Sequence, residues 1–304
     1  MGFYETKKKV DVKDIIEISS EFITAKINPF GAELVSLYDT ESFTEYLWQQ
    51  DTKWWKRSAP ILFPIVGKLL DDRYRVGNKF YSMGQHGFAR DLKFQVVRAE
   101  KDSAHLKLEY TEETLKKFPF KFVLEVKFKV YGPKLIVDYE VRNVDRREML
   151  FSIGSHPAFN IPLGEGEKFE DYYIEFEEDE YGGAFYLEKG LVNFHNLPDR
   201  KMFKSKKIPL RHGLFQNDAL IFKDMNSTKV SLKNINNSRS IIMEIENAPY
   251  LGLWAPDGAP FVCIEPWFGV ADGVDSKNDF LEKEGLITLE SGKCFQSSYT
   301  LFVN

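Results

Sequence analysis

Three short segments of the chain combine a titratable side chain with glycine, proline and aromatic residues, and they are the best candidates for a reactive site. They are residues 84–91 around His86, residues 154–160 around His156 and residues 263–269 around Glu265. Glycines near His86 let the backbone approach a ligand closely. The prolines that follow His156 and Glu265 favour extended backbone at both residues. We therefore expect these three side chains to meet at one ligand.

Two histidines and one glutamate suit either a divalent-metal site or general acid/base catalysis. The three residues are far apart in the sequence and match neither a metal-binding helix motif nor the Gly-x-Ser-x-Gly turn of hydrolases. Glu265 ends the apolar run 261–264, where a carboxylate costs free energy unless it is paired or used. We predict proton transfer by His86, His156 and Glu265, with no metal and no cofactor.

The other histidines and the tryptophans have plainer explanations. His105, His195 and His212 lie in strand-like or highly charged segments, and we interpret them as structural or surface residues. Most tryptophans belong to a core, although a few could offer a flat face to a sugar ring. Glycoside hydrolysis needs two opposed carboxylates, and only Glu265 is a candidate.

Residues 120–144 carry the clearest secondary-structure pattern. Apolar and charged residues alternate on both sides of the turn at residues 131–134, which predicts an antiparallel hairpin with one face in water. Further short strands are predicted at residues 22–27, 105–110, 219–222, 229–232, 241–246, 261–265 and 297–303. Helical periodicity is limited to residues 111–118 and 275–284, the latter with Asp275 or Ser276 as N-cap. Because alternating strand and helix units are absent, we predict an all-β sandwich or barrel, with residues 1–304 as a single domain.

Charge and cysteine content exclude several classes of partner. Lys and Arg total 41 against 46 Asp and Glu, which gives a net charge of -5. The basic residues are scattered among acidic ones along the chain, which disfavours a nucleic-acid partner. No apolar run approaches the roughly 20 residues that span a bilayer, so no membrane association is expected. The cysteines, Cys263 and Cys294, show no zinc-ligand spacing, and a reducing cytoplasm is the expected location. No oligomeric state is predicted.

At the three candidate segments the sequence resembles the aldose 1-epimerase (galactose mutarotase) family, especially its LacX-like branch. The motifs are Gln-His-Gly-Phe-Ala-Arg at residues 85–90, Ser-His-Pro-Ala-Phe at residues 155–159 and Glu-Pro-Trp at residues 265–267. Residues 28–34 and 58–68 are similar to two further family segments. The resemblance implies a galactose mutarotase-like β-supersandwich, mostly antiparallel with few short helices, that binds a sugar on one curved sheet.

The same resemblance implies an isomerase that interconverts the α and β anomers of a hexose. His156 then corresponds to the general acid, Glu265 to the general base, and His86 to a second histidine that hydrogen-bonds the sugar. Asp218 matches the position of a substrate-binding aspartate. The family's usual arginine near the second signature is replaced by Lys68.

Two alternatives remain open at this point. Related sandwiches act on hexose phosphates, and a phosphate here would require at least two of the cations Arg57, Lys68, Arg73 and Arg90 to converge on one rim of the cleft. A non-catalytic carbohydrate-binding protein would need the cleft but not the acid/base pair. The expected partner in every case is a small-molecule sugar or sugar phosphate, with Asp218, Lys68, Arg57, Arg90 and Trp267 as the candidate substrate-binding residues.

Overall fold

The computed structural model describes residues 15–180, 182–199, 201 and 206–304, and it is built almost entirely from β-strands. The larger of its two main sheets has nine strands in the order β18-β15-β20-β21-β25-β11-β10-β9-β8. In that order the strands are Lys207–Pro209, Tyr172–Phe176, Lys229–Asn234, Ser240–Ile245, Cys294–Val303, Lys134–Asn143, Phe122–Tyr131, Ser103–Glu109 and Gln95–Ala99. Neighbouring strands run antiparallel throughout. The all-β, mostly antiparallel fold predicted from the sequence is confirmed.

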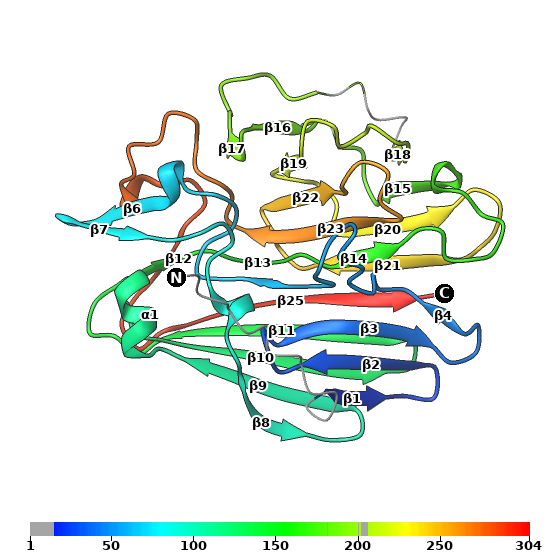
Figure 1. Ribbon diagram of the computed structural model, residues 1–304, viewed down its shortest axis with the longest axis horizontal. Helices are drawn as coiled ribbons and strands as arrows, with labels where there is room; N and C mark the ends of the chain where they lie inside the picture. The colour runs from blue at the N-terminus through cyan, green and yellow to red at the C-terminus, as the bar shows by residue number, and fades with distance from the viewer. Residues whose placement is uncertain (1–14, 181, 200, 202–205) are drawn as a thin grey trace, which may run out of the picture.

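The second main sheet has the order β17-β16-β19-β22-β23-β13-β5, with β14 also paired to β23. In that order its strands are Leu191–Val192, Phe185–Glu188, Leu220–Lys223, Tyr250–Trp254, Phe261–Phe268, Ile153–Ser155 and Ile61–Leu62, and β14 is Ala158–Asn160. A four-stranded sheet contains β1 Ile16–Ser19, β2 Ile23–Asn28, β3 Glu33–Asp39 and β4 Thr44–Glu45. Figure 1 shows this smaller sheet beside β8 to β11 and the second main sheet beyond β25.

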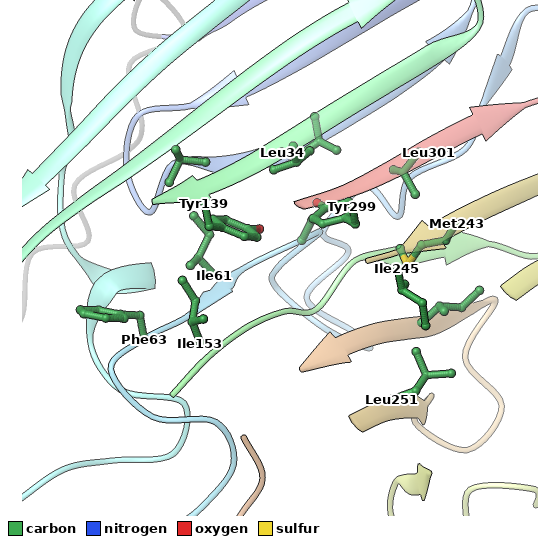
Figure 2. Close-up of a cluster of buried hydrophobic side chains, with 14 of the residues drawn as sticks. Leu34, Ile61, Phe63, Tyr139, Ile153, Met243, Ile245, Leu251, Tyr299 and Leu301 are labelled. Carbon is green, nitrogen blue, oxygen red and sulfur yellow. The ribbon is translucent and has the colours of Figure 1, made fainter. Parts of the chain in front are cut away.

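The hairpin of β10 and β11 forms as its sequence pattern predicts. Buried and half-exposed residues alternate along both strands, and the ladder closes at Tyr131 opposite Lys134. The buried side chains face the core between the sheets. Figure 2 shows Tyr139 and Tyr299 of the nine-stranded sheet pointing toward Ile61 and Ile153 of the second sheet. One face of the hairpin therefore contributes to the core and the other meets water.

Strand β23 is buried on both faces, which explains why its sequence is a continuous apolar run. Val262 and Ile264 belong to the core shared with the nine-stranded sheet. Phe261 and Cys263 alternate with them and pack instead against Trp48 in a separate cluster on the opposite face. That opposite face is where the candidate site lies.

Helices are few and short. Helix α1, Glu112–Lys117, forms where a helix was predicted at residues 111–118, and the Thr111 side chain caps it. The expectation for residues 275–284 was wrong in detail, because neither Asp275 nor Ser276 caps a helix there. The segment contains only the short 3-10 helix Phe280–Glu282, whose N-cap is Asp279. Within the described ranges, no helix has the length and apolar character required to span a membrane.

The remaining pairs of strands are small. Strands β6 Arg73–Val76 and β7 Lys79–Ser82 form a hairpin, and β12 Met149–Phe151 pairs with β24 Ile287–Leu289. The β6–β7 hairpin projects at the end of the molecule where α1 lies (Figure 1). The loop that follows β7 carries His86 into the site.

The core between the two main sheets gives a direct stability test. Leu251 on β22 is fully buried and points into this core (Figure 2), so Leu251→Ala should lower the free energy of unfolding by about 2–5 kcal/mol in urea titrations. Leu281→Ala is the matched control because Leu281 is 73% exposed, and its effect should stay within about 0.5 kcal/mol. Equal effects of the two substitutions would contradict this packing.

Candidate active site

The register of β23 with its neighbours brings His156 and Glu265 together. Strands β13 and β14 are separated by His156 and Pro157, and both pair with β23 in the same continuous register, Gly154 opposite Trp267 and Ala158 opposite Cys263. The same register continued across the interruption places His156 directly opposite Glu265. The Nε2 atom of His156 lies 3.2 Å from a carboxylate oxygen of Glu265, and both side chains are almost completely buried.

Aromatic rings fix the orientation of His156. The Trp55 indole stacks on the imidazole with ring centroids 4.7 Å apart, and Trp254 meets it edge-on at 5.7 Å. The His156 Nδ1 atom has no hydrogen-bond partner, so its ring is held mainly by aromatic packing, with Nε2 at ion-pair distance from Glu265. This leaves Nε2 as the nitrogen that faces the carboxylate.

His86 is held by the backbone of Gly67. The Gly67 N–H donates to His86 Nδ1 at 3.1 Å, and the His86 N–H donates to the Gly67 carbonyl at 2.8 Å. Because Nδ1 accepts a hydrogen bond, the neutral ring carries its proton on Nε2 and presents a donor. The imidazole centroid lies 5.6 Å from that of His156.

The loop around His86 depends on glycine at position 87. Both His86 and Gly87 have left-handed backbone conformations, with φ of 65° and 70°. A Cβ atom on residue 87 would lie 2.2 Å from the carbonyl oxygen of Phe63. Only glycine avoids both the positive φ penalty and this clash.

A cavity of about 610 Å³ opens above the pair. Its volume lies in the usual range for a small-molecule site. The residues that line it come from β23, from β19 and from several loops, and they include His86, His156, Glu265, Asp218, Trp55, Trp254, Trp267, Arg57 and Arg90. Apolar rings and a few convergent polar groups therefore share one cavity.

Burial makes His156 and Glu265 behave as one titrating unit. Loss of water raises the pKa of Glu265 well above its ordinary value, and the nearby Asp218 charge raises it further. Loss of water lowers the pKa of His156, with the positive charge of Arg90 acting in the same direction. Together the two shifts favour a net neutral pair that holds a single proton, as expected for coupled buried groups.

His86 is also held neutral. Burial lowers its pKa well below the ordinary histidine value, and the charges of His156 and Arg90 add to the effect. A neutral His86 can donate one hydrogen bond through Nε2 without bringing a charge into the cavity.

Two arginines lie together at one side of the cavity. Arg57 donates to Asp91 at 2.6 Å and to the Arg90 carbonyl at 3.2 Å, while Arg90 donates to the Gln85 carbonyl at 2.7 Å. Burial lowers the pKa of Arg90 to about 10, so it stays charged at neutral pH. Its Nε atom is buried without a hydrogen-bond partner. The nearest carboxylate oxygen to this Nε atom is that of Asp91, at 3.9 Å.

The remaining predicted residues fall in different places. Asp218 lies in the turn before β19, lines the cavity and accepts a hydrogen bond from the Ala219 N–H. Lys68 is not among the residues that line the cavity, and its aliphatic chain lies against Gly190 at the edge. Arg73 is directed to the surface, where it pairs with Asp71. Of the four cations considered for a phosphate, Arg57 and Arg90 line the cavity.

The Trp267 ring packs against Gly154 and Gly252 in the floor. Cβ atoms at Gly154 and Gly252 would lie 2.7 Å and 2.5 Å from its indole ring, so these two glycines make room for it. The residue is 4% exposed, and its side chain lowers the pKa of Glu265, opposing the effect of burial. Trp267 therefore lines the cavity while remaining almost completely buried.

Sequence reasoning gave no role to two groups around the site. Glu33 is buried beside the arginines and accepts hydrogen bonds from the Ser58 and Ala59 N–H groups. Cys263 lies on the same face of β23 as Glu265. Among the described residues, His156, Cys263 and Glu265 form the one cluster whose donor atoms could share a metal ion, since those atoms lie within 4.8 Å of one another. Chemistry without a metal stays a prediction.

Comparisons with known proteins agree with this geometry. The model of the aldose 1-epimerase family matches residues 14–301. The chain belongs to the aldose 1-epimerase family. A similar protein is the chromosomal LacX protein of Lactococcus lactis subsp. lactis. It is 33% identical over 279 residues, which cover 88% of this chain and 92% of LacX.

Two solved structures place the fold within the galactose mutarotase-like group of the aldose 1-epimerase family. A galactose mutarotase related enzyme from Lactobacillus acidophilus is 34% identical, with a TM-score of 0.89 over 95% of this chain and 97% of its own. A galactose mutarotase-like protein from Lactobacillus casei is 33% identical, with a TM-score of 0.88 over 95% of this chain and 100% of its own. The predicted family and fold are confirmed.

The shared proton makes the folding stability depend on pH. The folded-state pKa of Glu265 is raised, so above about pH 7 the folded pair keeps one proton. In the unfolded chain neither Glu265 nor His156 binds a proton at this pH, so the proton is released on unfolding. Stability is then lost as pH rises. Relative to Glu265→Gln, the wild type should lose up to about 1.4 kcal/mol of unfolding free energy per pH unit above about pH 7, until the folded pair itself loses the proton. Urea titrations at several pH values measure this difference, and parallel pH profiles would contradict a retained proton.

Proposed function

We propose that this protein is an aldose 1-epimerase that interconverts the α and β anomers of a hexose by ring opening and closure. The observation that carries the proposal is the buried His156–Glu265 pair at the floor of a sugar-sized cavity. Anomer exchange needs one group to take a proton from the C1 hydroxyl and another to give one to the ring oxygen. A pair that holds a single proton has the right proton count for both tasks.

In the proposed reaction Glu265 removes the proton of the C1 hydroxyl while protonated His156 donates to the ring oxygen. The bond between C1 and the ring oxygen breaks, and C1 becomes an aldehyde. The pair now holds its proton on Glu265. Rotation about the C1–C2 bond presents the other face of the carbonyl, and the reverse transfers close the ring as the opposite anomer. The pair finishes with the same single proton.

Burial favours the uncharged form of the empty pair, with the proton on Glu265. A bound sugar would add hydrogen bonds to the carboxylate and the imidazolium, which stabilises the ion-pair form that begins the reaction. His86 would donate through Nε2 to a sugar oxygen, and Asp218 would accept from a hydroxyl. Trp55 and Trp254 offer the aromatic surface against which the apolar face of a sugar ring packs.

A second candidate is the same reaction on a hexose phosphate. Arg57 and Arg90 line the cavity together, and arginine is well suited to bind a phosphate through paired hydrogen bonds. Asp91 and Glu33 already offset part of their charge. Two of the four cations line the cavity, as the phosphate candidate requires, and the unphosphorylated sugar remains the first candidate because Asp91 and Glu33 already engage both arginines.

A binding protein without catalytic activity is the alternative from another class. Binding alone gives no reason to bury a carboxylate against an imidazole, because desolvating such groups costs free energy. The description of a similar chain as a galactose mutarotase related enzyme also favours an enzyme. Exchange measured on a panel of free and phosphorylated aldoses separates the three possibilities.

Removing either member of the pair should reduce turnover more than binding. Glu265→Gln keeps the shape but removes the base, and His156→Asn removes the acid. Each should lower the catalysed exchange rate by about 10²-fold or more, because a positioned acid or base typically contributes about 10²–10⁴-fold. Anomer exchange is measured by NMR in a weakly catalysing buffer with a sugar that the wild type converts.

Matched controls are available on the surface. His195 lies in an exposed segment with a 76% exposed side chain, and Glu282 is also exposed, so His195→Asn and Glu282→Gln should leave exchange unchanged. Near-wild-type exchange in Glu265→Gln would show that Glu265 is not the base.

The phosphate candidate predicts that substituting Arg57 weakens the binding of a hexose phosphate specifically. If the natural ligand is phosphorylated, Arg57→Gln should raise KM for the hexose phosphate by about 10- to 100-fold, the value of a lost charged hydrogen bond. KM for the free hexose should change little, and Arg73→Gln is the control because Arg73 lies outside the cavity. An equal rise for both sugars would remove the support for a phosphate subsite.

A further inference from the structure

Cys263 lies behind the cavity floor, two residues before Glu265 on β23, and it packs among Trp48, Ala158 and Phe261. Along β23, Cys263 and Glu265 share a face because side chains alternate between faces. Cys263 is fully buried and is paired across the ladders with Ala158 and Trp254. The mechanism proposed above gives the thiol no role.

The donor atoms of Cys263, His156 and Glu265 are close enough to converge on one ion. All lie within 4.8 Å of one another, and the imidazole and carboxylate are 3.2 Å apart. Tetrahedral zinc with sulfur, nitrogen and oxygen ligands needs donor separations of about 3.4–3.6 Å. Side-chain shifts of about 1 Å would therefore complete the geometry.

A second observation points to a ligand at the same place. One carboxylate oxygen of Glu265, Oε2, is buried without a hydrogen-bond partner, and the side chain is only 1% exposed. Buried polar atoms without partners are rare and call for an explanation such as an ion or water. The nearest charged partner of this oxygen is His156 Nε2 at 3.2 Å, an ion-pair contact in which no hydrogen bond forms.

We propose that the floor of the cavity binds a borderline or soft divalent cation, such as Zn²⁺ or Co²⁺, through His156, Cys263 and Glu265, with the fourth position open to the cavity. Three protein ligands and one open position is a common arrangement for zinc in proteins. The cation replaces the thiol proton and the single proton of the pair. Two protons go to solvent, and the net charge of the buried floor is unchanged.

The surroundings select against hard cations. Ca²⁺ and Mg²⁺ require several oxygen ligands, whereas the cluster offers one carboxylate, one thiol and one imidazole. Positive charge from Arg90 and Arg57 also reaches His156. A thiolate bond to a softer metal offsets this repulsion, whereas Mg²⁺ gains little from sulfur.

The consequence for activity rests on the proposed function. A cation on His156 and Glu265 would occupy both the acid and the base, so it would inhibit anomer exchange. The binding part of the proposal does not depend on any activity. The two parts therefore need separate measurements.

Binding is tested by titrating the full chain with Co²⁺ and recording its absorption spectrum. Wild type should bind one equivalent and show a thiolate-to-cobalt charge-transfer band with the d–d bands of tetrahedral cobalt. Cys263→Ser and Cys263→Ala should lose the charge-transfer band, with circular dichroism used to check folding. Cys294→Ser is the matched control, because Cys294 is exposed and should leave the spectrum unchanged.

The absence of a charge-transfer band at stoichiometric Co²⁺ in folded wild type would overturn the proposal. A band that persists in folded Cys263→Ala and disappears in Cys294→Ser would also overturn it. His156→Asn gives a further check, since loss of the nitrogen ligand should weaken Co²⁺ binding by about 10-fold or more.

Zinc inhibition separates this proposal from the proposed function. The inhibition constant of Zn²⁺ in the NMR exchange assay should rise by about 10-fold or more in Cys263→Ala, with each form compared with its own rate without zinc. A cobalt band with no exchange of any sugar would support the metal site and contradict the proposed function. Exchange without a cobalt band would support the proposed function and contradict the metal site.

Discussion

The contact between His156 and Glu265 is the constraint around which the site is built. A carboxylate that is almost fully buried is tolerated only when it is neutralised or paired. The register of β13 and β14 on β23 supplies the partner, because it places the imidazole directly opposite. Glycines at positions 154 and 252 then admit the Trp267 ring, which closes the floor around the carboxylate. The packing of Trp267 and the pairing of His156 with Glu265 thus both depend on how β13 and β14 pair with β23.

Much of the fold follows from local sequence. Alternation along residues 122–143 was sufficient to predict the hairpin of β10 and β11, since one face of this hairpin meets water. Strand β23 was recognisable only as an apolar run, because burial on both faces removes the alternation. Helical periodicity also predicted the helix at residues 111–118, whereas Asp275 or Ser276 was expected to cap a second helix whose N-cap is instead Asp279.

The three candidate segments around the site were also recognisable, because glycine and proline beside titratable residues are unusual within strands. Their mutual geometry was not. That His156 lies opposite Glu265 depends on a pairing between segments more than a hundred residues apart in the sequence, and no local pattern specifies such a register. The cations illustrate the same limit. Arg57 lines the cavity and donates a hydrogen bond to Asp91, whereas the Lys68 side chain lies against Gly190.

The cavity is built from two kinds of backbone. Its floor belongs to β23 in the middle of a sheet, where neighbouring ladders fix each side chain. Much of its rim belongs to loops, including residues 55–57 and the segment from Gln85 to Asp91. Loops accept substitutions and insertions far more readily than central strands. A lineage that keeps this floor can therefore exchange one sugar for another by rebuilding its rim, and divergence of ligand choice need not disturb the folding of the sheet.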